Sequence, residues 1–316
     1  MEPLLAALRA CAEPTRLRLL ALAARGAFCV IELTEILGQS QPRLSRHLKL
    51  LCDAGVMERV REGANVWFGL PPDPGLVQVI LERLPDGDPV LEADRRAAAR
   101  VLAERARIAT DQFHRQGADW DEMRALGLPA ADVEQALLGL VTGNAGRLLD
   151  IGTGTGRLLE LLAPRIRSGL GVDASRAMLA LARARLARPG LGHVSVRQAD
   201  MYRLPLAGHY DLVVLQMVLH YAEDPAAVLA EAARMVARGG RLVVVDLAEH
   251  DRTALSDRLA HRWAGFSDST VHALFEEVGL DPATPVIVPG PIDIRLWCAL
   301  GPAALVAAAT PEFVGA

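Results

Sequence analysis

Apolar and polar residues follow different patterns in the two halves of the chain. In the second half, short apolar runs that indicate buried strands are separated by stretches with apolar residues at helical spacing. These runs lie at residues 148–151, 169–172, 194–198, 210–216 and 241–246. Strands that alternate with helices predict an α/β domain.

The first 70 residues predict short helices followed by a hairpin. A helix begins at Pro14, a second covers residues 30–37 and ends at Gly38, and a third begins after the capping residue Ser40. In the third helix, apolar residues recur at i, i+4 and i+7, and this stripe is expected in the core: Leu44, Leu48 and Leu51. Two alternating segments follow, separated by a turn at residues 62–65. We therefore expect a helix-turn-helix with a β-hairpin wing.

The segment between these two patterns has a proline-rich boundary at residues 71–89 and one expected helix over residues 90–116. That helix carries a narrow apolar stripe between charged residues, made of Ala98, Leu102, Ala106, Ala109 and Phe113. Such a stripe fits packing against a second subunit, and it fits equally well packing on the chain's own second domain. The predicted organisation is a winged helix at 1–84, a linker or dimerisation helix at 85–116 and the α/β domain at 117–316.

Composition narrows the class of protein. The 316 residues are 51% hydrophobic and carry a net charge of −4, which argues against a globally basic nucleic-acid binder but not against a small DNA-binding module. No signal-peptide pattern and no membrane-spanning stretch is found, so we expect a cytoplasmic protein without a membrane partner. The four cysteines are scattered without a Cys-x-x-Cys pair, so reduced thiols and no metal site are expected: Cys11, Cys29, Cys52 and Cys298.

A glycine-rich turn supplies the first candidate chemistry. Three alternate glycines, Gly152, Gly154 and Gly156, separate an apolar run from an expected helix. Glycine can take positive φ and lets a ligand lie against the backbone, while the helix start presents unpaired N–H groups. A tight turn without a ligand is the alternative, but the strand–turn–helix context favours a nucleotide or carboxylate cradle. Asp173, nineteen residues after Gly154 at the end of the next run, is placed to bind ribose hydroxyls.

With Asp200 and Met201 after the third run and the apolar run at 210–216, these residues closely resemble class I S-adenosylmethionine-dependent methyltransferases. The resemblance covers residues 117–300 and implies a Rossmann-like, seven-stranded sheet that binds S-adenosylmethionine or its product, S-adenosylhomocysteine. In that family the glycine loop holds the methionyl part, the acid after the second strand takes the ribose, and the Asp and its neighbour flank the adenine. The implied cofactor residues are Asp150, Gly152, Gly154, Gly156, Asp173, Ala174, Asp200, Met201 and Gln216.

Residues after the fourth and fifth strands are expected to face the methyl acceptor. Methyl transfer needs an acceptor held in line with the sulfonium methyl, often with a base that removes a proton. The candidate acid/base groups near the methyl are His220, Tyr221, His250, Asp251 and His261, and of these His220 and His250 are predicted to be catalytic. Each has an ordinary alternative, because a Leu-His-Tyr segment can close the pocket by packing and His250 can cap a helix. The lack of an Asn-Pro-Pro-Tyr-like motif and of a cysteine triplet disfavours methylation of nucleic-acid bases or of arsenic.

Residues 5–70 resemble the ArsR/SmtB family of winged-helix repressors, through segments 13–17, 40–48 and 51–55. The arsenic-sensing Cys-Val-Cys pair of that family is reduced to Cys29, whereas a soft metal needs two or three thiolates in reach. Cys11, Cys29 and Cys52 could converge in space, but small buried core residues are the favoured interpretation. The resemblance implies a DNA-binding surface on the third helix and the wing, formed by Ser40, Gln41, Arg43, Ser45, Arg46, His47, Arg59 and Arg61.

Charge adds an expectation about assembly. Residues 1–70 contain nine basic and seven acidic residues, a net of +2. Because this is modest, we expect a homodimer that places two recognition helices on the half-sites of a double-stranded operator. A winged helix used only for protein contact is the alternative.

Two functions remain open. The first is a DNA-binding transcriptional regulator whose second domain senses the cofactor or methylates a small molecule. The second is a small-molecule methyltransferase whose winged helix serves dimerisation or regulation. The fold does not decide between them, and a complete set of cofactor motifs argues for binding rather than for turnover.

Overall fold

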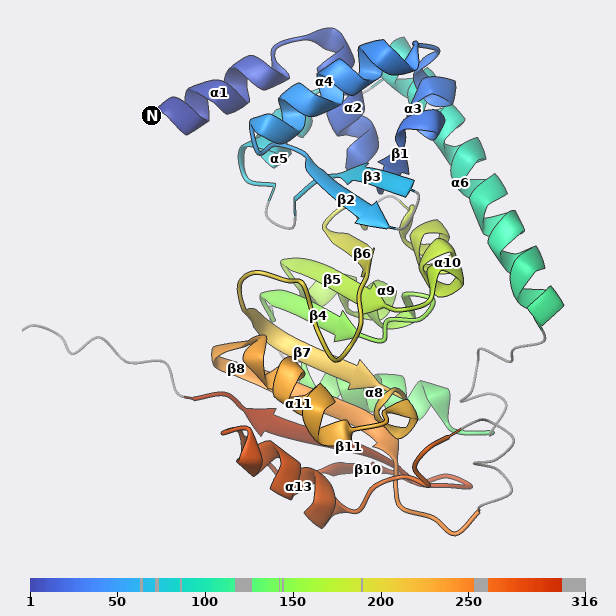
Figure 1. The fold of residues 1–316 in the computed structure, drawn as a ribbon, viewed down its shortest axis with the longest axis vertical. Helices are drawn as coiled ribbons and strands as arrows, with labels where there is room; N and C mark the ends of the chain where they lie inside the picture. Colours follow the sequence, from blue (N-terminus) through green and yellow to red (C-terminus); the bar gives the residue numbers. More distant parts are fainter. Residues whose placement is uncertain are drawn as a thin grey trace, which may run out of the picture.

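The computed structural model describes residues 1–62, 65–71, 74–85, 87–116, 127–141, 143, 145–188, 190–252 and 261–302. A winged helix lies at one end of the elongated molecule and an α/β domain at the other, and the long helix α6 (Pro89–Gln116) runs along the side of both (Figure 1). None of the helices in the described part of the chain is long and apolar enough to span a bilayer.

The N-terminal domain has the predicted helix-turn-helix and wing. Helix α3 ends at Gly38, whose φ of 63° is left-handed, and the stripe of Leu44, Leu48 and Leu51 is buried, as predicted. A short strand, β1, was not predicted and pairs with β3. The elements are α1 (Glu2–Cys11), α2 (Pro14–Ala23), β1 (Phe28–Cys29), α3 (Val30–Leu37), α4 (Gln41–Asp53), β2 (Glu58–Glu62), β3 (Asn65–Gly69) and α5 (Leu76–Leu81).

The second domain is built on a mostly parallel sheet with strand order β10-β11-β8-β7-β4-β5-β6. This confirms the Rossmann-like α/β prediction, and the two-residue strand β9 adds to the expected seven by pairing with β11. Strand β11 is antiparallel to β8. The strands are β4 (Arg147–Ile151), β5 (Ser168–Asp173), β6 (Val194–Gln198), β7 (Tyr210–Gln216), β8 (Val236–Leu247), β9 (Asp281–Pro282), β10 (Val286–Val288) and β11 (Ile294–Leu300).

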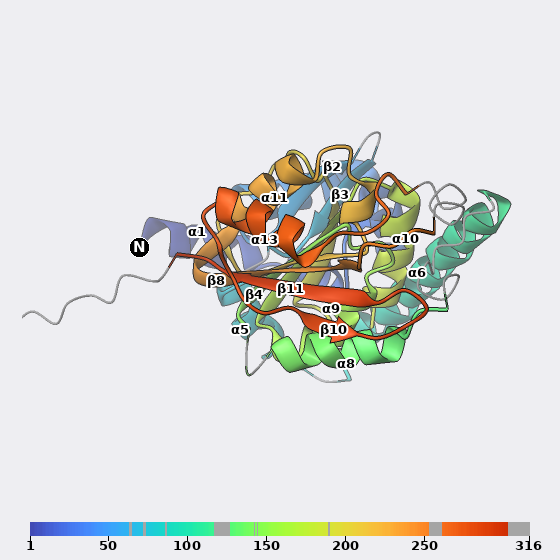
Figure 2. The same ribbon diagram turned by 90° about the horizontal axis from the view of Figure 1, so that it is seen from below.

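Alternation along the strands explains why helices cover both faces of this sheet. Leu149 and Ile151 of β4 pack in the core beneath α11 (Pro225–Arg234) and α13 (Asp268–Glu277). Leu148 points to the opposite core, formed with α8 (Ala130–Leu140), α9 (Arg157–Leu162) and the end of α10 (Arg176–Leu186). The two helical layers are seen on either side of the sheet in Figure 2. Each fully buried leucine contributes about 2 kcal/mol through the apolar surface it removes from water.

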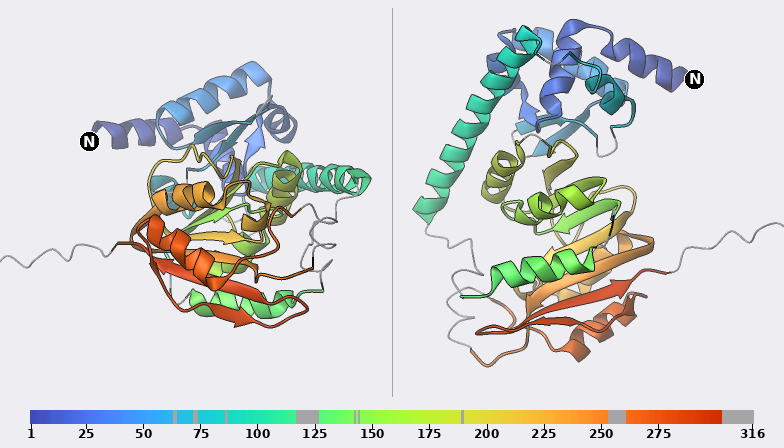
Figure 3. Two further views of the ribbon diagram at one scale, coloured as in Figure 1. Left: turned by 60° about the horizontal axis from the view of Figure 1, so that its bottom comes forward. Right: turned by 180° about the vertical axis from the view of Figure 1, so that it is seen from behind.

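The first part of the apolar stripe on α6 packs within the chain's own winged helix. Ala98 and Leu102 are buried in the core of the chain's own winged helix. Arg18 of α2 makes a two-pronged ion pair with Asp94 at 2.6 and 2.7 Å, which also fixes α6 to that domain. Farther along, α6 lies beside α10 of the α/β domain (Figure 3). The side chains of Ala106, Ala109 and Phe113 lie outside the described residues.

The strand order places a crevice at the carboxyl ends of the central strands. The chain passes from β4 to β5 to β6, then returns to add β7 on the other side of β4. At such a reversal the loops after neighbouring parallel strands diverge, and the space between them is where open α/β sheets bind ligands. The glycine turn lies at this point.

Candidate functional site

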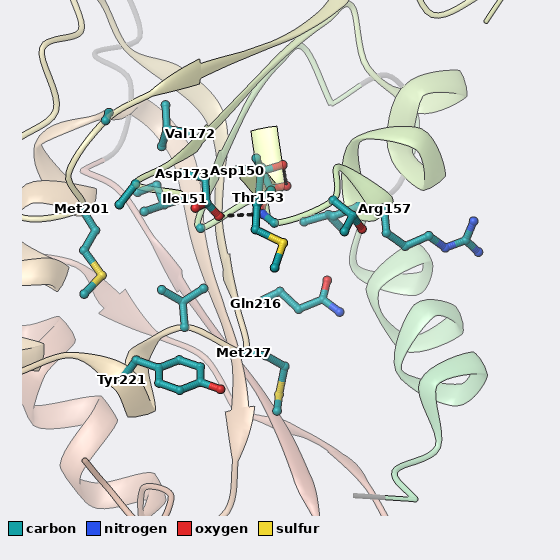
Figure 4. A pocket seen from close by; sticks show the side chains of 18 of the residues that line it. Asp150, Ile151, Thr153, Arg157, Val172, Asp173, Met201, Gln216, Met217 and Tyr221 are labelled. Carbon is teal, nitrogen blue, oxygen red and sulfur yellow. Dashed lines mark hydrogen bonds between the residues drawn. The ribbon is translucent and has the colours of Figure 1, made fainter. Parts of the chain in front are cut away.

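A cavity of about 760 Å³ opens at the carboxyl ends of β4, β5 and β7, within the usual size of small-molecule sites. Figure 4 shows its lining around the glycine turn. Of the predicted cofactor residues, eight line it: Asp150, Gly152, Gly154, Asp173, Ala174, Asp200, Met201 and Gln216.

The three glycines are needed for three different reasons. All have positive φ, of 74°, 52° and 74° for Gly152, Gly154 and Gly156. A Cβ at Gly152 would collide with Val218, whereas a Cβ at Gly154 would project into open space, so the Gly154 backbone is bare toward the cavity. Gly156 is not among the lining residues; it begins α9, and a Cβ there would lie 3.2 Å from Ala182 of α10. Gly156 therefore permits close packing of α9 on α10, and its contact with the cofactor stays a prediction.

Two carboxyl groups shape the charge of the cavity. Asp150 is buried, and the Thr153 hydroxyl donates a 2.6 Å hydrogen bond to it. Burial raises the pKa of Asp150 to about 7, and the nearby charge of Asp173 acts in the same direction. Asp173 accepts the Gly154 N–H at 2.9 Å and the Ser175 N–H at 2.8 Å, one on each oxygen, and burial raises its pKa too. Each oxygen keeps a second lone pair for a ligand hydroxyl.

The two sides of the cavity differ. On one side of Asp173 lies Met201, and on the other lies Arg157 (Figure 4). Arg157 makes a bidentate ion pair with Glu134 at 2.7 and 2.8 Å, which ties α9 to α8 at the rim. An apolar thioether on one side suits a flat base, and the charged rim suits the ends of an amino acid.

Sequence reasoning missed thirteen further lining residues. Some of these residues lie in or beside the glycine-rich turn, where Thr153 follows the first glycine and Arg157 is the first residue of the helix. Others come from distant elements and have no local signal, as with Glu134 from α8. The missed residues are Ala130, Glu134, Ile151, Thr153, Thr155, Arg157, Leu158, Val172, Met178, Arg185, Ala199, Met217 and Val218.

The candidate catalytic His220 is completely buried and is not among the lining residues. Its Nδ1 lies 2.6 Å from an oxygen of Asp246, which is also completely buried. The neighbouring Tyr221 is 39% exposed and lines the cavity, with its ring 4.2 Å from the His220 ring centroid. The ring of His261 lies 4.3 Å from that of His220 on another side. The structure thus groups the three side chains but brings only Tyr221 to the cavity.

His250, the other candidate catalytic group, lies in the loop after β8 and does not line the cavity. Its Nδ1 accepts the N–H of Arg252 at 3.2 Å, and burial lowers its pKa. Catalytic roles for His220 and His250 stay predictions.

The predicted DNA-binding residues are exposed, with one exception. On α4, the side chains of Gln41, Arg43, Ser45 and Arg46 are exposed, as is Ser40 before the helix. His47 is half-buried, and its Nδ1 lies 3.5 Å from Glu13, the N-cap of α2. Arg59 and Arg61 are exposed on the wing strand β2.

The four cysteines are free, and only Cys11 is fully buried. Burial raises the pKa of the Cys11, Cys29, Cys52 and Cys298 thiols, which keeps them protonated near neutral pH. Within the described residues no group of three or more His, Cys, Asp or Glu side chains could hold a metal ion.

Comparison with known families agrees with both halves of this description. Residues 13–59 match the family described as bacterial regulatory protein, arsR family, and residues 149–244 match the methyltransferase domain family. The chain therefore carries an arsR-type helix-turn-helix region and a methyltransferase domain.

Individual relatives that are methyltransferases match part of this chain. The chain is 34% identical over 118 residues to phosphatidylethanolamine N-methyltransferase of Cereibacter sphaeroides and 27% identical over 138 residues to ubiquinone biosynthesis O-methyltransferase of Acinetobacter baumannii. These matches cover 37% and 42% of this chain and 58% of each relative. N-methyltransferase NodS from Bradyrhizobium japonicum, solved with S-adenosylhomocysteine, aligns with a TM-score of 0.50 at 26% identity, over 61% of this chain and 98% of NodS.

Proposed function

We propose that this protein is a DNA-binding transcriptional regulator whose methyltransferase-fold domain binds S-adenosylmethionine or S-adenosylhomocysteine and adjusts DNA affinity. The observation that supports the proposal is that one molecule combines an exposed polar helix surface with a formed cavity. The polar surface of α4 is exposed at one end, and a formed cavity with acids and a bare glycine turn lies at the other. In this organisation residues 1–84 bind DNA, 85–116 connect, and 117–316 bind the cofactor.

The residues present fit this cofactor. Asp173 would hold the ribose, the Gly154 backbone would lie against the methionyl part, and Met201 with Asp200 would flank the adenine. The bound cofactor would supply an electrophilic methyl group on a positive sulfur. The buried Asp150 would add negative charge to that neighbourhood when ionised.

We further propose a homodimer on the operator. Leu4 and Leu8, one turn apart on α1, are 53% and 42% exposed, and this uncovered apolar strip would fit a second copy of the chain. A symmetric dimer would present two α4 helices to two half-sites, and this would compensate for the small net charge of the domain.

A binding experiment tests the regulator. Duplexes selected by the full chain from a random DNA library are titrated at one fixed salt concentration, without ligand and with saturating S-adenosylmethionine or S-adenosylhomocysteine. We expect the Kd to change by at least about fivefold between states, the lower end of usual allosteric couplings. If no duplex is selected in any ligand state, the proposal that the protein is a DNA-binding regulator is wrong.

Substitutions on α4 sharpen this test. Arg43→Ala or Arg46→Ala should weaken binding by about tenfold or more if the side chain reads a base edge, and should lower the salt dependence if it holds a phosphate. Arg167→Ala is the matched control, since Arg167 is an exposed arginine before β5, at the end of the sheet away from the cavity. Equal loss in all three variants would show that α4 has no special role.

A second candidate is catalysis on a small molecule, favoured by the enzyme names of the relatives and by the exposed Tyr221 at the cavity wall. Tyr221 would contact the acceptor directly, with His220 behind it. Incubation of the protein with methyl-labelled S-adenosylmethionine and cell extract tests this, with Tyr221→Phe as the comparison. Transfer of label to a metabolite would establish turnover, whereas no transfer over a broad set of extracts would leave the sensor.

A further inference from the structure

The wing (β2 and β3) has different neighbours on its two faces. Because side chains alternate along a strand, Arg59 and Arg61 share one face of β2 and are exposed to solvent. Glu58 lies on the opposite face, and so does Val60, which pairs with Trp67 across the hairpin. That second face, which we call the inner face of the wing, is turned toward the methyltransferase domain (Figure 1).

Two contacts hold the inner face to that domain. The Arg197 guanidinium of β6 donates a 2.6 Å hydrogen bond to the Glu58 carboxylate. The Trp67 ring lies between two arginines, with the Cζ of Arg105 at 4.7 Å and the Cζ of Arg183 at 4.4 Å from its centroid. Arg183 belongs to α10 and is 8% exposed, so the aromatic ring faces a largely desolvated cation, the setting in which cation–π attraction is strongest.

The contact between the domains is close-packed. A Cβ at Gly192, in the turn before β6, would overlap the carbonyl oxygen of Ala24 at the end of α2. A small cavity of about 50 Å³ lies between the two surfaces. The winged helix is therefore seated on the methyltransferase domain and is not merely tethered by α6.

Both contacts stand on elements that continue into the cofactor cavity. Helix α10 carries Arg183 toward the wing, while Met178 and Arg185 of the same helix line the cavity. Strand β6 carries Arg197, and the residues directly after that strand line the cavity as well. A ligand held by these elements thus lies one helix or strand away from the wing.

We propose that the inner face of the wing is the joint through which the cofactor cavity and the DNA-binding surface influence each other, with Trp67 and Arg183 at its centre. The inference rests on the proposed function. Occupancy of the cavity changes how α10 and β6 hold the wing, and this moves Arg59 and Arg61 relative to α4. Such coupling requires only that the joint differ in stability between liganded and ligand-free protein, and it is reciprocal.

Hydrogen exchange tests the joint without DNA. In the full chain, saturating S-adenosylhomocysteine should change the exchange rates of the β2 and β3 amides by several-fold. In Arg183→Met, which keeps length but loses charge, the ligand should still bind and the wing amides should no longer respond. Arg183→Lys should restore part of the response, and Arg167→Met is the matched control that should behave as wild type.

The outcomes separate this inference from the proposed function. If the ligand binds but leaves wing exchange unchanged, or if Arg183→Met responds as wild type does, the joint is overturned while DNA binding can still stand. If no ligand binds, the proposed function falls and the joint with it. Should Arg183→Met fail to fold, Glu58→Gln serves as the second variant, since that carboxylate is 35% exposed and its loss is mild. It should weaken the wing response, and an undiminished response there counts against the joint.

The same variants test whether the joint also changes the affinity for DNA. In wild type, the ratio of DNA Kd values without and with ligand should lie between about 5 and 150. In Arg183→Met that ratio should fall close to one, with both ligand and DNA still bound separately. A ratio equal to that of wild type would overturn the joint and leave the regulator intact.

Discussion

Asp150 and Asp173 are two acids of the cofactor cavity whose protonation depends on burial. Burial raises the pKa of both, and that of Asp150 reaches about 7 although the Thr153 hydroxyl stabilises its ionised form. Near neutral pH the ligand-free pocket is therefore close to the point at which Asp150 gains or loses a proton. Ligands of different charge should feel this differently.

S-adenosylmethionine should bind more tightly as the pH rises. Its sulfonium favours an ionised carboxylate, so binding near neutral pH should release a proton from Asp150, and affinity should rise from about pH 6 to about pH 8 and then level off. S-adenosylhomocysteine lacks the sulfonium charge and should show a weaker trend, and Asp150→Asn should flatten it. Calorimetry in two buffers of different ionisation heat counts the proton; none released in wild type would contradict the expectation.

The same carboxyl should affect stability. Because the folded pKa is raised above the unfolded value of 3.8, the folded protein holds the proton more tightly, and the stability contributed by Asp150 is present below about pH 4 and lost as the pH rises through about 7. Asp150→Asn should therefore gain a few kcal/mol relative to wild type between about pH 4 and pH 8. Urea unfolding of both proteins across this range measures the difference, and parallel curves would disprove it.

Gly152 is the glycine at which a side chain should do most harm. Gly152→Ala places a methyl group at a φ of 74° and against Val218, so the turn or the cavity wall must shift. We expect cofactor affinity to fall by about tenfold or more. Gly139→Ala, in α8 with open space around it, is the control and should leave affinity unchanged. Calorimetric titration of the two variants decides.

At the scale of elements, β8 holds the turn that follows β7. Asp246 at the end of β8 accepts the backbone N–H groups of Leu219, His220 and Leu247 as well as contacting the His220 ring. Just before, Met217 has a φ of 55°, the one positive φ outside glycine in the described chain, and it lines the cavity. The geometry favours a positioning role for His220, in which it fixes the wall that carries Met217 and Tyr221.

Asp246→Asn tests that role. The amide puts a donor where backbone donors must be accepted, so we expect a loss of about 1–3 kcal/mol in the free energy of unfolding together with weaker cofactor binding. Glu249→Gln, an exposed acid two residues past the strand, should change neither. If Asp246→Asn kept wild-type stability and affinity, the turn would not depend on this carboxylate.

At the scale of the whole molecule, the seated winged helix should make the two domains unfold together. We expect one calorimetric transition in wild type. The free energy of unfolding should rise by about 2.7 kcal/mol when S-adenosylhomocysteine is present at 100 times its Kd. In Arg183→Met the ligand should stabilise only the methyltransferase domain, so a separate winged-helix transition should appear and stay unmoved. Two independent transitions already in wild type would argue against a rigid contact between the domains.

The elements and the glycine turn of the cavity could be predicted from the sequence because their signals are local. The apolar runs predicted β4, β5 and β7, and Gly38 predicted the end of α3. The glycine turn and Asp173 predicted the position of the cofactor cavity. Strand β1, with two residues, carries too little periodicity to be predicted. Glu134 reaches the cavity rim from a helix whose sequence says nothing of the turn that it approaches.

By itself, the sequence determined which segments are helix, strand and turn, because apolar spacing and glycine conformations act over a few residues. It also determined the two kinds of site, since their side chains cluster in short motifs. Tertiary structure alone decided that His220 is buried against Asp246 and that Tyr221 reaches the cavity instead. It alone decided that Trp67 of the wing meets Arg183 of α10, because that contact joins residues far apart in the chain and depends on how two domains pack.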